Sequence, residues 1–123
     1  MDNPNPARVY PWDDDFDESR CNVGETGIGT TSAVGLFPAG ASPYGVLDMS
    51  GNVWEWCLTK WVDDYQGYIE KERELQDVEG EPPRVVRGGS WYFGRRLVRC
   101  ACRLGCGPDS RFDGFGFRVV VAS

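Results

Sequence analysis

The sequence contains no histidine, and this absence limits the chemistry that the protein can perform. Imidazole is the commonest general base near neutral pH and a frequent ligand of iron, zinc and copper. Reactions that depend on an imidazole base or on an imidazole-bound metal are therefore excluded. The five cysteines are an odd number and cannot all pair within one chain, and their spacing matches no zinc-binding pattern. We expect free thiols, as in a reducing compartment.

Long apolar runs are also missing. No stretch of the sequence approaches the roughly 20 apolar residues that a membrane helix needs. The first residues lack the charged and apolar regions of a secretion signal, so the cytoplasm is the default compartment. Basic residues are outnumbered, with 13 Lys and Arg against 19 Asp and Glu and a formal charge of −6. This balance disfavours nucleic acid as a partner, because binding to phosphates needs a basic surface.

The composition is that of one compact domain rich in loops. The chain has 123 residues, and a hydrophobic fraction of 41% is enough to offset the entropy lost on folding. Sixteen Gly and eight Pro predict many turns and irregular segments, because both residues interrupt helices and strands. We expect a flexible leader over residues 1–7 and a single domain over residues 8–123.

Three segments have the composition of strands. The alternating run WEWCL predicts a strand with Trp54, Trp56 and Leu58 on its buried face. A second short strand is expected within residues 84–91, where a Gly-Gly pair allows a turn or a close approach of two backbones. The β-branched run in residues 114–123 is typical of a central strand.

Two charged segments are predicted to lie at the surface. Residues 65–80 could form a short helix around 69–75, but the apolar face of that helix would be thin, so we interpret the segment as an exposed excursion. Residues 13–18, DDDFDE, carry five acidic side chains that would repel one another if buried. We favour a solvated loop here over the alternative of a cation site.

Four stretches together resemble one family, the formylglycine-generating (sulfatase-modifying factor) domain: VYPWDDDFDESRCN, YGVLDMSGNVWEWC, RVVRGGSW and GFRVVV. The resemblance runs from about Arg8 to the end. It implies an α+β fold of the C-type-lectin-like kind, with a small antiparallel sheet, long irregular loops and little helix. The family's domain is roughly twice as long, so this chain resembles its C-terminal half or a reduced form of it.

The resemblance also bears on catalysis. Enzymes of the family oxidise a substrate cysteine with a copper ion held by two cysteines shortly after the GGS motif. Residues 92–98 occupy that region here and contain no cysteine. Cys100 and Cys102 come later and, on a strand, would share one face. Copper(I) needs soft thiolate ligands, so we expect no enzyme activity, with a copper-dependent oxidase as the alternative. The related sulfoxide synthases need a histidine-bound iron, which this chain cannot assemble.

Some members of the family bind calcium around the motif LDMSGNVWE, and no other cofactor is expected. A second family site would begin at Asn22, but its acidic ligand is not identifiable here. Calcium prefers hard oxygen ligands. The alternative is that the aspartate caps a turn and the glutamate pairs with an arginine. The candidate ligands carried over from the family are the side chains of Asp48 and Glu55 and the carbonyls of Gly51 and Val53.

Residues 92–118 combine a regular frame with residues of no consistent chemistry. The pattern resembles the variable proteins of diversity-generating retroelements, in which adenines, typically of AAC codons, are randomised and Lys, Glu, Gln, Met and Trp become unreachable. None of these five residue types occurs between Tyr92 and Arg118, although all occur earlier. The frame consists of Arg99, Ala101, Arg103, Pro108, Asp109, Arg111, Gly116 and Arg118.

We therefore predict a non-catalytic protein that displays a hypervariable surface, at about residues 92–115, to a protein or cell-surface ligand. The frame arginines are expected to pair with the acidic first half. Phe93 and Phe112 could instead belong to the core. A further alternative is a structural module that docks through residues 63–81, and the oligomeric state is open. The candidate ligand-binding residues are Tyr92, Phe93, Gly94, Arg95, Arg96, Leu97, Cys102, Leu104, Gly105, Cys106, Gly107, Ser110, Phe112, Asp113 and Gly114.

Overall fold

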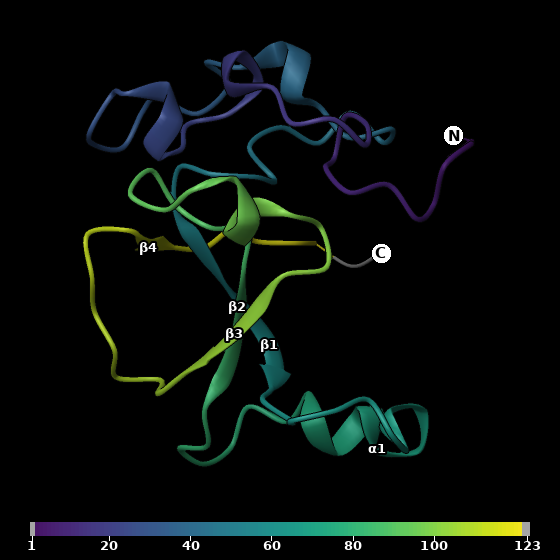
Figure 1. The fold of residues 1–123 in the computed structure, drawn as a ribbon. Helices are drawn as coiled ribbons and strands as arrows, with labels where there is room; N and C mark the ends of the chain where they lie inside the picture. Colours follow the sequence, from purple (N-terminus) through teal and green to yellow (C-terminus); the bar gives the residue numbers. More distant parts are fainter. Residues whose placement is uncertain (1, 122–123) are drawn as a thin grey trace.

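A computed structural model describes residues 2–121, and most of this chain is irregular. Figure 1 shows the N-terminal loops above a small sheet, with the α-helix at the opposite end of the sheet. Residues 2–7, predicted to be a flexible leader, form no helix or strand. The side chain of Asn5 nevertheless donates to both carboxylate oxygens of Asp14 at 3.2 Å.

Within residues 2–121 the sheet has four strands in the order β3-β2-β1-β4. The pairs β1/β2 and β2/β3 are antiparallel, as expected, whereas β4 runs parallel to β1. The predicted antiparallel sheet is therefore mixed at one edge. The parallel pair arises because residues 107–114 bring the chain back to the start of β1, where Trp54 N donates to the Gly114 carbonyl at 2.6 Å. The strands are β1 Trp54–Lys60, β2 Arg84–Arg87, β3 Arg103–Cys106 and β4 Phe115–Gly116.

Helical structure is sparse in the described part of the chain. The α-helix α1, Tyr68–Leu75, begins one residue before the predicted helix, and its Ile69 is 84% exposed, which confirms an exposed excursion. Among residues 2–121 no helix has both the length and the apolar character needed to cross a membrane. The remaining helical elements are the short 3-10 turns η1 Glu18–Arg20, η2 Gly24–Thr26, η3 Pro38–Gly40 and η4 Arg95–Val98.

The core has one part in the sheet and one under the loops. In the sheet, Trp54 is 2% exposed and Val86 is fully buried. Leu58, predicted on the same buried face as Trp54, is instead 53% exposed. The reason is an irregularity in the β1/β2 register between Trp56 and Lys60, which breaks the alternation of side chains. Under the loops the buried residues are Tyr10, Cys21, Val23 and Val98.

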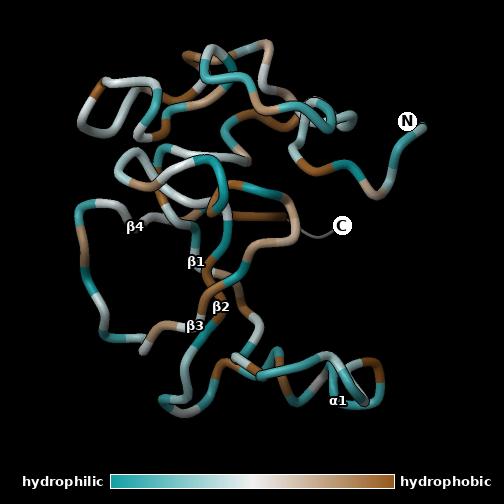
Figure 2. Tube along the Cα trace, viewed as in Figure 1, coloured by the Kyte–Doolittle hydropathy of each residue, from teal (hydrophilic) through white to brown (hydrophobic). Residues whose placement is uncertain are grey.

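The prediction of a central strand over residues 114–123 is wrong for the described part of that range. Only Phe115 and Gly116 pair, with β1, and residues 122–123 lie outside the described residues. Val119, Val120 and Val121 are 80%, 88% and 91% exposed, and Figure 2 colours this run as hydrophobic. A β-branched run favours extended backbone, but it becomes a strand only where another strand supplies hydrogen-bond partners.

Three distant backbone segments cross at Gly51. The amide of Gly51 donates to Gly88 O at 2.6 Å, and the amide of Asn52 donates to Asn22 O at 2.8 Å. A Cβ at Gly51 would overlap the carbonyl of Asn22, and a Cβ at Gly89 would lie 2.5 Å from Val98 Cγ1. The close approach predicted for the Gly-Gly pair is thereby confirmed, and φ is positive at both of its residues.

Replacing Gly51 by alanine tests this crossing. Gly51→Ala adds a Cβ where the Asn22 carbonyl already lies, at a φ of +80°. We expect the free energy of unfolding in urea to fall by about 3 kcal/mol or more. Gly45→Ala is the matched control, because Gly45 has a φ of +76° with nothing within 4 Å of its Cβ position. The control should lose only about 1 kcal/mol of backbone strain. Equal losses in the two variants would show that the crossing adds nothing to stability.

Candidate functional site

An apolar cavity of about 370 Å³ opens where residues 90–93 pass the start of β1. No carboxylate, amine, guanidinium or thiol lines it. The walls come from four separate parts of the chain, so the fold and not a local motif creates the hollow. The lining residues are Trp54, Ser90, Trp91, Tyr92, Phe93, Leu104, Phe112, Gly114 and Phe115.

The backbone around the Gly-Gly pair positions the first wall of the cavity. After this turn Ser90 is 1% exposed, and the amide of Trp91 donates to Asn52 O at 3.0 Å. Two residues later, the carbonyl of Phe93 accepts from Gly24 N at 2.9 Å. These bonds fix residues 90–93 at both ends. On the opposite wall, a Cβ at Gly114 would lie 3.1 Å from Ser90 Oγ, so glycine allows the two walls to approach.

Aromatic rings in the wall of the cavity pack against one another edge to face. The ring centroids are 5.9 Å apart for Trp54 and Phe93, and 5.1 Å apart for Phe112 and Phe115. Such pairs contribute about 0.5–1.5 kcal/mol each beyond the area that they bury. At the mouth, Tyr92 is 71% and Phe112 67% exposed. The cavity therefore has a packed interior and an exposed aromatic rim.

Five of the predicted ligand-binding residues line this cavity: Tyr92, Phe93, Leu104, Phe112 and Gly114. The exposure of Phe112 argues against the alternative that it belongs to the core, whereas Phe93, 37% exposed, lies at the boundary. Four further residues line the cavity that the sequence did not lead us to predict: Trp54, Ser90, Trp91 and Phe115. For Ser90 and Trp91 a signal existed, because the GGSW motif directly precedes the variable segment.

The other predicted residues lie elsewhere. Gly94 is the N-cap of η4, and Arg96 and Leu97 are on η4. Gly105 on β3 packs against Trp61, where a Cβ would lie 2.7 Å from the indole ring. Arg95 lines a different hollow, beside the acidic loop of residues 13–18. The remaining residues lie just before, on, or after β3: Cys102, Cys106, Gly107, Ser110 and Asp113.

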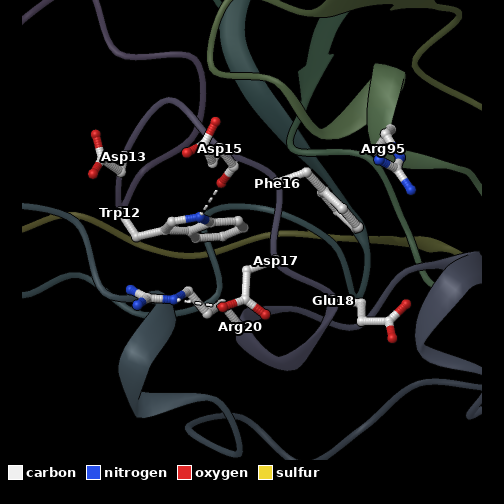
Figure 3. Close-up of a pocket in the computed structure, with 8 residues that line it drawn as sticks. All are labelled: Trp12, Asp13, Asp15, Phe16, Asp17, Glu18, Arg20 and Arg95. Atoms are coloured by element: carbon white, nitrogen blue, oxygen red, sulfur yellow. Dashed lines mark hydrogen bonds and ion pairs between the residues drawn. The ribbon is translucent and has the colours of Figure 1, made fainter.

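The second hollow, of about 510 Å³, lies beside the acidic loop (Figure 3). Arg95 reaches it, with its guanidinium 4.5 Å from the ring centre of Phe16 and an ion pair of 3.1 Å to Glu25. Hydrogen bonds from Ser19, and then from Arg20, hold the pKa of Asp17 below its ordinary value. Asp13 accepts from the amide of Asp14, and Asp17 caps a turn at Ser19 and pairs with Arg20, which agrees with the interpretation of residues 13–18 as a solvated loop. Its lining residues are Trp12, Asp13, Asp15, Phe16, Asp17, Glu18, Arg20 and Arg95.

The cysteines lie outside both hollows. Burial raises the pKa of every thiol, and for Cys21 the value rises to about 12. Cys100 lies in a turn and Cys102 in the coil before β3, so the two cysteines do not lie together on a strand. Where the family holds copper, after the GGS motif, the structure has the apolar cavity and the buried Val98. Those residues do not fit a copper ion.

Two of the four predicted calcium ligands, the side chains of Glu55 and Asp48, already have partners. Both carboxylate oxygens of Glu55 accept from Arg118, at 2.6 and 2.8 Å, and Arg118 also donates to the carbonyls of Leu47 and Asp48 at 3.0 Å. A carboxylate oxygen of Asp48 accepts from Gly35 N at 2.8 Å. The guanidinium of Arg118 thus occupies the Glu55 carboxylate, and calcium would have to compete with it for this ligand. At the second family position, Asn22 Oδ1 is buried without a hydrogen-bond partner.

Comparison with protein families matches residues 5–123 to the sulfatase-modifying factor enzyme 1-like domain. Among curated proteins, the inactive C-alpha-formylglycine-generating enzyme 2 of Mus musculus is 31% identical over 95% of this chain and 38% of its own length. The formylglycine-generating enzyme of Mus musculus is 33% identical over 89% of this chain and 29% of its own length. The relatives thus include both an inactive protein and an enzyme, and the chain spans less than half of either.

Two solved structures share the fold. PvdO from Pseudomonas aeruginosa has a TM-score of 0.71 and 30% identity, over 89% of this chain and 42% of its own. The Treponema denticola variable protein 1 also has a TM-score of 0.71, at 24% identity, over 92% of this chain and 41% of its own. These likenesses confirm the predicted α+β, C-type-lectin-like architecture.

The thiol pKa values lead to a prediction for alkylation. Because burial raises each pKa above the ordinary value of 9.0, the reactive thiolate is scarce at neutral pH. We expect the iodoacetamide reaction of each cysteine, resolved by mass spectrometry, to rise with pH through a midpoint above 9.0, with Cys21 slowest. In urea all five midpoints should return to the ordinary value. A folded-state midpoint below it at Cys100 or Cys102 would identify an activated thiol and revive the oxidase alternative.

Calcium binding stays a prediction, and the geometry makes it a competition with Arg118 for Glu55. We expect the wild-type protein to bind calcium only with a Kd above about 1 mM, weaker than extracellular calcium modules. Arg118→Gln should free the carboxylate and lower that Kd at least tenfold in isothermal titration. Arg111→Gln is the control, because Glu55 pairs with Arg118 in the structure. Tight binding by the wild type would show that Arg118 yields to the ion.

Proposed function

The chain belongs to the family of sulfatase-modifying factor enzyme 1-like domains, and we propose that it binds a ligand without catalysing a reaction. The observation that carries this proposal is the apolar cavity, because its exposed rim consists of residues from the segment with the variable pattern. A surface of this kind supplies contact area and shape. The residues that line the cavity supply no carboxylate, amine or thiol.

The thiols argue against catalysis by this chain. A copper oxidase of this family needs two thiolates near one metal ion. Here the pKa of both Cys100 and Cys102 is raised by burial, although Arg87 acts in the opposite direction on each. With no histidine in the sequence, the histidine-bound iron of the related sulfoxide synthases has no ligands in this chain. The inactive mouse relative is in keeping with a member that has lost its activity.

We also propose that the rim is diversified by a retroelement. Two features support this: the absence of Lys, Glu, Gln, Met and Trp from residues 92–118, and a fold shared with a protein described as a variable protein. The four lining residues that were not predicted to vary, Trp54, Ser90, Trp91 and Phe115, form the constant part of the cavity. If the interior residues stay the same and the rim residues differ between diversified copies of the protein, each copy would prefer its own ligand.

The partner in this proposal is a protein or a cell-surface molecule. Tyr92 and Phe112 stand at the mouth with most of their surface exposed. Exposed aromatic side chains with few rotatable bonds make large contacts at low entropic cost, and they dominate many protein interfaces. A ligand broad enough to touch both sides of the mouth would bury them.

Peptide selection tests the proposal. Peptides selected on the wild-type protein from a random phage-displayed library should bind with micromolar Kd values. Tyr92→Ala should weaken them at least tenfold, which is about 1.4 kcal/mol. Phe117→Ala is the control, because Phe117 is 74% exposed but does not line the cavity. If Tyr92→Ala leaves the Kd of the selected peptides unchanged, or if Phe117→Ala raises it as much as Tyr92→Ala does, the binding surface lies elsewhere and the proposal is overturned.

A further inference from the structure

We infer that the apolar cavity holds one aromatic side chain of a protein partner as the central anchor of the interface. This inference rests on the proposed function and names the chemistry that the site selects. It follows from the lining of the cavity, the exposure of the rim, one buried donor without an acceptor, and the charge of the surrounding segment.

The lining excludes a charged anchor and favours a ring. A lysine, arginine, aspartate or glutamate side chain entering the cavity would lose its hydration and find no ion to pair with. An aromatic side chain buries about 150–250 Å² and packs well on ring edges and faces. Such edges and faces are what Trp54, Phe93 and Phe115 present around the hollow.

The rim indicates a protein rather than a small molecule. Leu104 is 39% exposed, Phe112 67% and Tyr92 71%, and all three line the cavity. A ligand that filled only the 370 Å³ hollow would leave most of this apolar rim in water. A partner with a projecting ring and a surrounding surface would cover the hollow and the rim together, as central anchors in protein interfaces do.

The Trp91 indole N–H favours tyrosine over phenylalanine as the anchoring residue of the partner. This donor is buried and has no hydrogen-bond acceptor within residues 2–121, and leaving such a group unpaired costs about 1–3 kcal/mol. Tyr92 packs edge to face against Trp91 with 5.8 Å between ring centres, and its exposure leaves it room to rotate. That rotation would open a path to the N–H. Among aromatic side chains, tyrosine carries an oxygen that can accept this hydrogen bond, whereas phenylalanine does not.

The charge of the segment that supplies the cavity rim indicates what flanks the anchor. Residues 92–118 contain six arginines and two aspartates, whereas the whole chain has a charge of −6. Two of these arginines, Arg95 and Arg118, pair with Glu25 and Glu55, and the segment stays positive without them. A positive segment on an acidic protein attracts acidic partners. We therefore expect aspartate or glutamate beside the anchoring tyrosine of the partner.

Defined probes test the anchor by NMR titration of the ¹⁵N-labelled protein. The probes are the N-acetyl amides of Tyr, Phe, Leu and Glu, and a seven-residue peptide with Tyr between two Asp residues. We expect the Tyr amide to shift the resonances of Ser90, Leu104 and Gly114 and the indole N–H of Trp91. The Tyr amide should bind at least threefold more tightly than the Phe amide, and the peptide at least tenfold more tightly than the Tyr amide. The Leu and Glu amides should bind weakly or not at all.

Matched variants assign the effect to the cavity. Leu104→Asp places a charge on its wall and should abolish binding of the Tyr amide. Leu58→Asp makes the same change on an exposed residue of β1 that does not line the cavity, and it should leave binding unchanged. Trp91→Phe should remove the preference for Tyr over Phe. Equal affinities for these two amides in the wild type would overturn the role given to Trp91.

The outcomes separate this inference from the proposed function. Absence of shifts at the cavity, or equal shifts with the Glu amide, would overturn the aromatic anchor. If peptides from the library still lose affinity with Tyr92→Ala, the proposed function stands without that anchor. If they do not, the proposed function fails as well.

Discussion

The crossing of the backbone at Asn22, Gly51 and Gly88 is the constraint on which the rest of the structure depends. The sheet is small, and its longest strand has seven residues, so hydrogen-bond ladders alone cannot hold the long loops. The loops are joined to the sheet where these backbones touch. Asn22 and Asn52 extend the contact, because their side chains donate to the carbonyls of Thr30 and Ser32. This polar centre is almost fully buried, which makes its hydrogen bonds costly to lose.

Because of this crossing, the residues that stabilise the fold differ from the residues that we propose to contact a ligand. The crossing orients residues 90–93, so Ser90 and Trp54 are buried while Tyr92 stands at the surface. A rim residue can change without touching the Asn22–Gly51 contact, since its side chain points away from it into the cavity mouth. Two glycines among the predicted variable positions are exceptions. Gly105 has no room for a Cβ unless Trp61 moves, and a Cβ at Gly114 would lie 3.1 Å from Ser90 Oγ. The fold therefore allows diversity mainly around the cavity.

Motifs in the sequence predicted the fold better than the site. Trp54 and residues 84–91 were placed correctly, because alternation and the Gly-Gly pair are local signals. The valines after Arg118 were misjudged, because strand propensity does not reveal whether a partner strand is present. The cavity could not be predicted as a whole, since its walls come from β1, β3 and two loops that are far apart in sequence. Three residues of the segment predicted to vary, Tyr92, Leu104 and Phe112, line the cavity with exposed side chains.

Arginine has a structural part in this domain that helps to explain its abundance, with eleven Arg against two Lys. Irregular loops leave carbonyl groups without ladder partners, and one guanidinium can donate to several of them. Arg84, 8% exposed, donates to the carbonyls of Leu58 and Asp77. Arg103 donates to Val62 O and lies over the rings of Trp61 and Tyr65. Arg118 joins Glu55 to two further carbonyls. A lysine could replace the charge at these positions but not the set of directed N–H groups, so Arg84, Arg103 and Arg118 hold the irregular loops to one another in a way that lysine could not.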